Sequence, residues 1–289
     1  MDRKQSWATR LSAAALLIGV CAATNAQAET IKFGRAPWPG VTVKTTVASQ
    51  LLKAIGYQTH ITQASWTIDL QGVARGDIDA DLGIWMPTQK STVHPLVKSG
   101  KVNLLVNNVP DAKYDLVVPN YVWKAGVHSI ADLNKHAAKF NHRVYGIEAG
   151  NDGNEIVKKA IKNNTYNLGK WSLRPSSTAV MLTEVGKKIK KHKWVVFLGW
   201  KPHWMNIKYN IRYLKDPKKI WGGNSSVYTA INPKFQKNNP NVALFLKQMV
   251  PYSNTQSHWI YKFGFKNEPA KKVADDWIPG TKERVFPRG

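Results

Sequence analysis

Short apolar runs alternate with amphipathic segments along most of this chain, and this alternation constrains the fold more than any other feature. Runs such as IKFGRA (31–36) and WVVFLGW (194–200) are typical of strands, whereas VTVKTTVASQLLKAIG (41–56) has the periodicity of a helix. Strands and helices alternate in this way when crossover helices connect parallel strands. The sequence therefore predicts an α/β fold with parallel sheets.

The alternating pattern falls into two successive sets, separated around Pro119–Tyr121. Each set is long enough for an α/β domain of its own. The tail from about Val227 contains one short strand and several helices, which is too little for a third domain. We expect the tail to return to the first domain, so that 29–119 and 227–289 form lobe I and 120–226 form lobe II.

The first residues have the pattern of a secretory signal peptide. Three basic residues precede an apolar stretch at 11–23, and an Ala-Gln-Ala cleavage site ends at Ala28. The apolar stretch is too short to span a hydrocarbon core of about 30 Å. Removal of 1–28 also removes the only cysteine, Cys21. A chain without cysteine fits a bacterial periplasm better than a disulfide-stapled secreted domain, so we expect periplasmic localisation.

The chain is strongly basic, with a formal net charge of +24 that becomes +22 without the signal peptide. Such an excess is compatible with nucleic acid or an anionic surface as a partner. The lysines are spread along the chain, however, and the densest run, GKKIKKHK (186–193), continues a helical pattern as a solvated face. Because no nucleic-acid-binding motif accompanies the charge, we expect no nucleic-acid partner. A basic adhesion or nucleic-acid-binding protein remains the less favoured alternative.

The motifs of common enzymes are absent from the sequence. There is no G-x-S-x-G elbow, no phosphate-binding loop, no dinucleotide fingerprint and no H-E-x-x-H pair, and the histidines are scattered. GNDGNE (150–155) lacks the spaced carboxylates of a calcium loop and suits a helix start better. We therefore expect no enzyme activity, no cofactor and no metal site.

Tryptophan recurs where predicted strands end. DLGIWMP (81–87) and VFLGWKP (196–202) share Gly, Trp and Pro, and RAPWPG (35–40) is a weaker echo. Ligands of open α/β sheets bind beyond the carboxyl ends of the strands. Indole faces gathered there would suit a cation without N–H donors, such as a trimethylammonium group. The alternatives are that these rings fill the tops of the lobes, or that the ligand is a sugar or an amino acid.

At these segments the sequence resembles a known family, the periplasmic substrate-binding proteins of ABC importers for glycine betaine, choline and carnitine, and most closely the choline-binding type. The resemblance extends from about Ile31 to beyond Tyr228. It is carried by GYQTHI, GDIDADLGIWMPT, AKYDLVVPNYV, VYGIEAGNDGN and WVVFLGWKPHWMN. It implies a type II fold, in which two doubly wound α/β lobes are joined by a two-strand hinge and close on the ligand. It also implies permease and ATPase partners, and we expect a monomer.

The resemblance further implies a ligand site. In the choline-binding type, three tryptophans and one tyrosine enclose the ammonium group, and those positions match Trp38, Trp85, Trp200 and Tyr114. A polar residue that contacts the other end of the ligand matches Asn151. The family's choline binders have an aspartate where this chain has Gly40. This difference weakens the case for choline and removes a group that would repel a carboxylate-bearing ligand.

Overall fold

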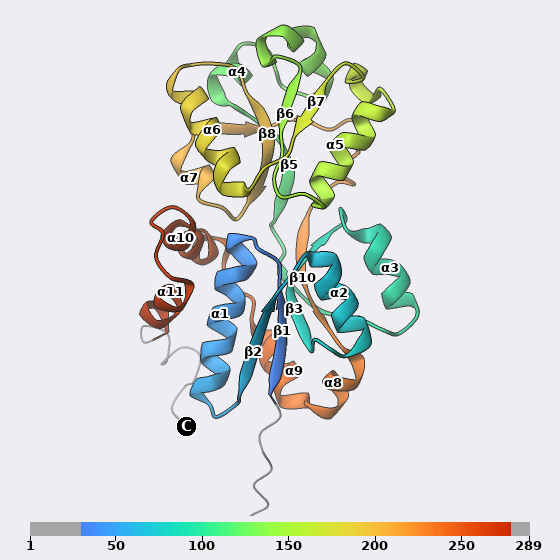
Figure 1. Ribbon diagram of the computed structural model, residues 1–289, viewed down its shortest axis with the longest axis vertical. Coiled ribbons are helices and arrows are strands. Elements are labelled where there is room, and N and C mark those ends of the chain that lie inside the picture. The colour runs from blue at the N-terminus through green and yellow to red at the C-terminus, as the bar shows by residue number, and fades with distance from the viewer. Residues whose placement is uncertain (1–29, 279–289) are drawn as a thin grey trace, which may run out of the picture.

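The computed structural model describes residues 30–278, which form two lobes, each built on a five-stranded sheet (Figure 1). The predicted signal peptide lies outside the described residues. The first sheet has the order β2-β1-β3-β10-β4 and the second the order β7-β6-β8-β5-β9. The strands are β1 Ile31–Arg35, β2 Thr59–Gln63, β3 Ala80–Met86, β4 Asn103–Val109, β5 Lys113–Pro119, β6 Arg143–Tyr145, β7 Ser172–Arg174, β8 Val196–Lys201, β9 Ile211–Tyr213 and β10 Ser226–Ile231.

Helices cover both faces of the first sheet, with α1 on one side and α2 on the other (Figure 1). The helices are α1 Pro39–Ala54, α2 Trp66–Arg75, α3 Lys90–Lys98, α4 Asn120–Lys124, α5 Asp152–Lys162, α6 Thr178–Lys190, α7 Met205–Lys208, α8 Pro233–Asn238, α9 Pro240–Gln248, α10 Ser253–Gly264 and α11 Ala270–Trp277, with 3₁₀ segments η1 Ile130–Phe140 and η2 Thr165–Asn167. The predicted α/β fold is therefore confirmed.

Both sheets are mixed, which corrects the expectation of parallel sheets. β1 pairs in parallel with β2 and β3, but β10 is antiparallel to β3 and β4. In the second sheet β6 is parallel to β7 and β8, and β5 is antiparallel to β8 and β9. The chain enters lobe II through β5 and returns to lobe I through β10. Both strands are antiparallel to their neighbours in the sheet.

The predicted lobe boundary after Pro119 is wrong for one strand. β5, Lys113–Pro119, pairs with β8 from Lys113↔Lys201 to Val117↔Phe197 and thus belongs to the second sheet. The chain crosses between the lobes in the short segment 110–112 and returns in 214–225, before β10. Two chain segments therefore connect the lobes, and Tyr114 lies on lobe II rather than lobe I.

Helix α1 begins directly after Trp38, with Pro39 as its first residue. Proline suits this position because its fixed φ is helical and its missing N–H has no partner there anyway. Pro39 thus starts a helix, whereas Pro87 and Pro202 each directly follow a strand, β3 and β8. The peptide bonds before Pro87 and Pro202 are both cis. The repeated phrase around Trp85 and Trp200 therefore has the same local structure in both lobes.

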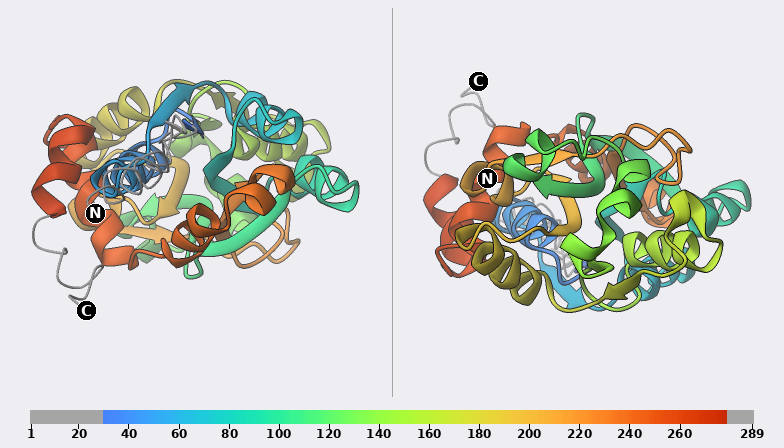
Figure 2. Two further views of the ribbon diagram at one scale, coloured as in Figure 1. Left: turned by 90° about the horizontal axis from the view of Figure 1, so that it is seen from below. Right: turned by 90° about the horizontal axis from the view of Figure 1, so that it is seen from above.

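The carboxyl-terminal helices α10 and α11 pack beside α1, as the red and blue ribbons show in both views of Figure 2. α10 also reaches lobe II, because Ile260 belongs to that lobe's hydrophobic core. Just after α10, the ring of Phe265 lies 5.0 Å from that of Trp204. The tail thus packs on lobe I and also contacts lobe II.

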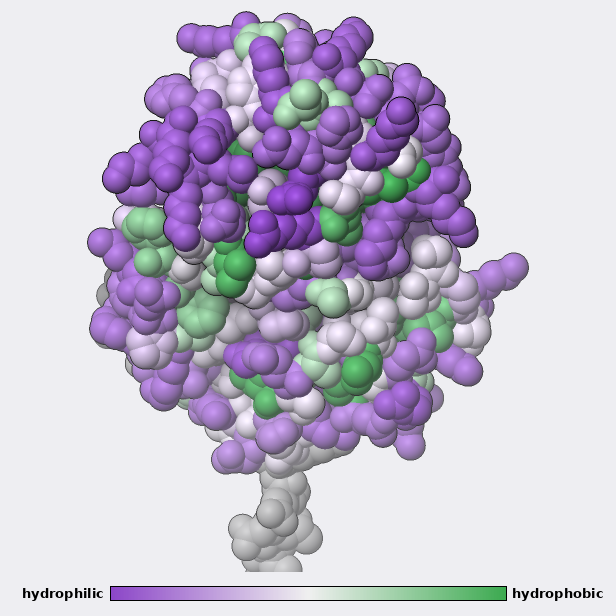
Figure 3. All heavy atoms as spheres, turned by 45° about the horizontal axis from the view of Figure 1, so that its top comes forward, coloured by the Kyte–Doolittle hydropathy of each residue, from purple (hydrophilic) through white to green (hydrophobic). Residues whose placement is uncertain are grey.

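Hydrophilic side chains cover most of the surface of lobe II in the space-filling view of Figure 3. The basic run at 186–193 lies at the end of α6 and beyond it, where Lys187, Lys191 and Lys193 are exposed. The run is thus solvent-exposed at these positions, of which Lys187 lies on the helix and Lys191 and Lys193 follow it.

Candidate ligand-binding site

One cavity between the lobes is lined by all six residues that the sequence singled out. Lobe I contributes Trp38, Gly40 and Trp85, and lobe II contributes Tyr114, Asn151 and Trp200. The remaining lining residues are Val41, Lys44, Gly83, Val109, Ile147, Asp152, Pro202, Val227 and Gln256. The sequence-predicted residues are therefore brought together from the two lobes.

Two tryptophans line the lobe I side of the cavity. Trp38 is the residue before α1 and is 9% exposed. Trp85 lies near the carboxyl end of β3 and is partly exposed, and its backbone N–H donates to Oε1 of Gln89 at 3.0 Å. This bond ties the strand end to the turn that follows it. The backbone at both tryptophans is therefore held in place by the structure next to it.

Tyr114 lies at the centre of the aromatic contacts. Its ring centroid is 5.6 Å from that of Trp85 and 6.0 Å from that of Trp200. β5 and β8 place Tyr114 and Trp200 directly opposite each other in the antiparallel register. The cavity wall thus continues from one lobe to the other through tilted and edge-on rings, the arrangement that aromatic pairs prefer.

Two buried aromatic side chains support this wall from behind. Trp221 packs against Tyr114 with ring centroids 5.0 Å apart, and His203 packs edge-on against Trp200 at 4.8 Å. Burial lowers the pKa of His203 to about 3, so the imidazole is neutral at physiological pH. The sequence analysis singled out neither residue. Trp221 is far from Tyr114 in the sequence, whereas His203 follows Trp200 by three residues.

The glycine before each tryptophan of the repeated phrase is required by close packing. A Cβ on Gly83 would lie 2.9 Å from Cγ2 of Val41, and a Cβ on Gly199 would lie 2.6 Å from the methyl carbons of Val117. Real side chains do not tolerate such distances. The glycines of the LG-W pattern therefore lie at backbone positions where a neighbouring side chain occupies the space that a β-carbon would need.

Asn151 connects the polar edge of the cavity to the aromatic wall. The hydroxyl of Tyr114 donates to Oδ1 of Asn151 at 2.6 Å, and the N–H of Gly153 donates to the same oxygen at 2.8 Å. Asn151 is thereby the N-cap of α5, as the sequence predicted. Its Oδ1 already accepts two bonds, so its amide N–H groups are the part of the side chain left to meet a ligand.

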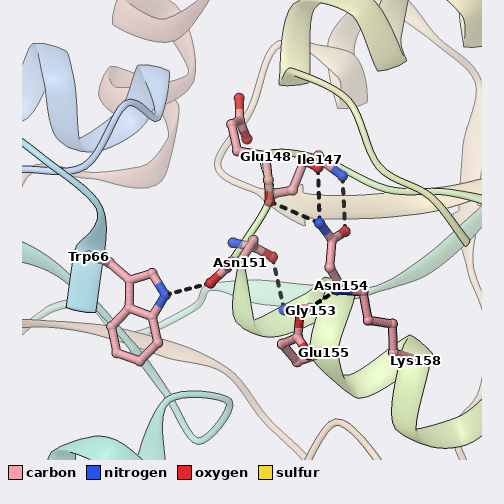
Figure 4. Close-up of polar contacts among 9 residues, drawn as sticks. Trp66, Ile147, Glu148, Asn151, Gly153, Asn154, Glu155 and Lys158 are labelled. Carbon is pink, nitrogen blue, oxygen red and sulfur yellow. Dashed lines mark hydrogen bonds and ion pairs between the residues drawn. The ribbon is translucent and has the colours of Figure 1, made fainter. Parts of the chain in front are cut away.

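A hydrogen bond joins the two lobes next to the cavity residue Asn151. Nε1 of Trp66, at the start of α2, donates to the carbonyl oxygen of Gly150 in lobe II at 3.2 Å (Figure 4). The same loop is held from within its own lobe, because the Asn154 side chain bonds both backbone groups of Ile147 (Figure 4). Trp66, which the sequence analysis did not single out, is thus a contact that joins the lobes.

The two charged side chains among the lining residues have opposite signs and come from opposite lobes. Lys44, on α1, is 2% exposed, and Asp152, the first residue of α5, is 8% exposed. Burial raises the pKa of Asp152 to about 6, although Thr88 and Gln89 beside it favour the charged form. Burial lowers the pKa of Lys44 to about 7, and the nearby Asp81 opposes that shift. The cavity thus has one cationic and one anionic pole, and the sequence analysis identified neither.

Within residues 30–278, no cluster of three or more His, Cys, Asp or Glu side chains could hold a metal ion. Over the same range, no helix has both the length and the apolar character needed to cross a membrane. Apart from the aromatic residues, the polar side chains that line the cavity are the amides of Asn151 and Gln256 and the opposed charges of Lys44 and Asp152.

Comparisons with known proteins agree with this architecture. Residues 29–279 match the substrate-binding domain of ABC-type glycine betaine transport systems. Two α/β lobes with a cavity between them are the architecture of a solute-binding protein, and this match shows the family. The chain belongs to the family of ABC-type glycine betaine substrate-binding domains. It is therefore a substrate-binding component of an ABC importer, a class of transport proteins that work in the periplasm.

Individual relatives give the same picture. An ABC-transporter choline-binding protein in complex with choline has a TM-score of 0.84 and 28% identity, covering 89% of this chain and 90% of that one. Lactococcal OpuAC, closed and complexed with glycine betaine, has a TM-score of 0.79 and 29% identity, covering 89% and 97%. The uncharacterized protein ORF1 of Chromohalobacter salexigens is 43% identical over 130 residues, which cover 45% of this chain and 84% of that protein.

Proposed function

We propose that this protein binds a quaternary ammonium compound of the choline or glycine betaine type in an aromatic box formed by Trp38, Trp85, Tyr114 and Trp200. The protein is exported by its cleavable signal peptide, acts as a monomer and delivers the ligand to the permease and ATPase subunits of the importer. It catalyses no reaction.

The observation that carries this proposal is that four aromatic side chains from both lobes line one cavity. A quaternary ammonium has no N–H to donate, so ring faces and methyl contacts must hold it. Each ring contributes about 0.5–2 kcal/mol, and four rings approach the roughly 8 kcal/mol of micromolar binding. The box thus supplies a large share of the affinity, and desolvation with a few polar contacts supplies the rest.

The division of the box between the lobes couples binding to closure. Trp38 and Trp85 move with lobe I, and Tyr114 and Trp200 move with lobe II. Only a closed arrangement brings all four rings to one ligand, so the ligand favours that arrangement by its differential affinity. Both ligand-bound relatives, with choline and with glycine betaine, support the same ligand class.

A thermal-shift panel tests the ligand class. Choline, glycine betaine and carnitine should raise the melting temperature through linkage, whereas glucose and glutamate should not. A shift with glucose or glutamate alone would place the ligand in another class of solute. The same panel repeated in high salt tests the alternative of a protein that acts through its basic surface. Binding through phosphate contacts weakens steeply with salt, whereas binding in an aromatic box does not.

A further inference from the structure

Lys44 has a buried ammonium group beside the cavity, and no carboxylate in the described part of the chain lies close enough to neutralise its charge. Its Nζ donates to Oδ1 of Asn108 at 2.5 Å. The Asn108 amide nitrogen donates to the carbonyl of Leu82 and to Oγ1 of Thr229, which fixes its oxygen toward Lys44. An ammonium group has three N–H donors, and this neutral acceptor uses one of them. Among the described residues, no carboxylate lies within ion-pair distance of Lys44.

The acidic side chain that acts on Lys44 is that of Asp81 of β3, which already accepts another hydrogen bond. Oδ1 of Asp81 accepts the backbone N–H of Gly83 at 2.8 Å. Burial and the neighbouring Asp69 both disfavour the charged form of Asp81. A buried ammonium is costly without a close counter-charge. The cavity side of Lys44 is therefore suited to an anion that arrives with the ligand.

Gly40 opens the path from the cavity to Lys44. The two residues are four apart on α1 and so share one face of the helix, and both line the cavity. Side chains on a helix lean toward its N-terminus, which directs Lys44 toward the turn that contains Gly40. No side chain caps this N-terminus, and its dipole adds positive potential in the same place.

We propose that Lys44 binds the carboxylate of the ligand, so that this site selects zwitterionic quaternary amines such as glycine betaine or carnitine over choline. The inference rests on the proposed function. The ammonium occupies the aromatic box, and the carboxylate faces α1. Asp152 on the opposing lobe provides the matching negative pole, so a zwitterion aligns with the field of the cavity, whereas choline leaves Lys44 without a counter-charge.

The test compares calorimetric affinities for glycine betaine and choline in the wild type and in Lys44→Met, which keeps the stem and removes the charge. We expect the wild type to prefer glycine betaine. In Lys44→Met, affinity for glycine betaine should fall at least tenfold, and affinity for choline should stay the same or rise. Lys53→Met, on the exposed last turn of the same helix, is the matched control and should change neither affinity.

Choline binding also reports that the Lys44→Met site is folded, and Lys44→Gln provides a second neutral variant. Equal losses for both ligands, an unchanged affinity for glycine betaine, or a wild-type preference for choline would each overturn the role of Lys44. A wild-type protein that binds neither amine would instead reject the proposed function itself. The two failures are therefore distinguishable.

Discussion

The indole N–H of Trp66 in lobe I donates a 3.2 Å hydrogen bond to the carbonyl oxygen of Gly150 in lobe II. Gly150 directly precedes Asn151, the N-cap of α5 that also accepts the Tyr114 hydroxyl. The contact between the lobes is thus one residue away from the polar edge of the cavity. The position of Asn151 in the site therefore depends on how the lobes close.

Replacing Trp66 with Phe removes this bond and keeps most of the ring. A hydrogen bond of this kind contributes about 0.5–1.5 kcal/mol, so the closed arrangement should lose up to about tenfold in population. Ligand dissociation measured by stopped flow should accelerate accordingly. Trp171→Phe is the matched control, because its Nε1 donates to Asn134 within lobe II at 3.2 Å. Identical dissociation rates in the two variants would mean that the Trp66 bond does not hold the lobes together.

The tryptophans of the box should carry much of the affinity. Trp85→Ala and Trp200→Ala each remove one ring face and its methyl contacts, so each should weaken ligand binding at least tenfold with the fold intact. Calorimetry measures the affinity, and circular dichroism checks the fold. Trp123→Ala in α4 removes a half-buried ring outside the cavity lining and should leave binding unchanged. Near wild-type affinity in both box variants would refute the aromatic box.

Gly40→Asp should reverse the ligand preference. The new β-carbon would lie 3.4 Å from Cδ1 of Ile260, which a small shift can accommodate. Its carboxylate would stand four residues before Lys44 on one helix face, where opposite charges attract. We expect glycine betaine to bind several-fold more weakly and choline several-fold more tightly. Gly40→Asn, which has the same shape without the charge, should not change the ratio. An equal effect of both variants would indicate steric disturbance alone.

Asp115 should make the stability of lobe II depend on pH. Burial raises the pKa of Asp115 from 3.8 to about 8, with a smaller contribution from Asp216. Between these values the folded state holds a proton that the unfolded state has released, so this contribution to stability is full below about pH 4 and is lost as the pH rises toward 8. Asp115→Asn should therefore stabilise the protein increasingly from pH 5 to pH 8 in thermal melts. Exposed Asp77→Asn serves as the control, and a gain that is independent of pH would contradict this assignment.

The sequence predicted the α/β pattern and the positions of the tryptophans, because both depend on local periodicity and on proline. It did not predict which sheet takes β5, since YDLVVP is equally apolar in either lobe and its pairing with β8 is non-local. α3 was missed because Pro95 lies inside it, and β9 because it has only three residues. Such short or interrupted elements depend on tertiary packing, which no local pattern records.

The polar part of the site was less predictable than the aromatic part. Lys44 stands in a helix whose pattern favours lysine on the solvent side, yet α1 is buried over most of its circumference. The available signal was that Lys44 is the single charged residue between Pro39 and Leu52. Asp152 was not singled out, because its approach to Thr88 and Gln89 requires the lobes to close.

The most direct test of the aromatic box compares a quaternary amine with the carbon isostere that lacks its ammonium charge. Choline and 3,3-dimethylbutan-1-ol have the same shape, as do glycine betaine and 3,3-dimethylbutanoate, and each pair differs only in the positive charge that the ring faces attract. Calorimetric titration of the wild-type protein should show at least tenfold tighter binding of the quaternary ammonium member of the preferred pair. Equal affinity for the amine and its isostere would contradict recognition of a quaternary ammonium by Trp38, Trp85, Tyr114 and Trp200.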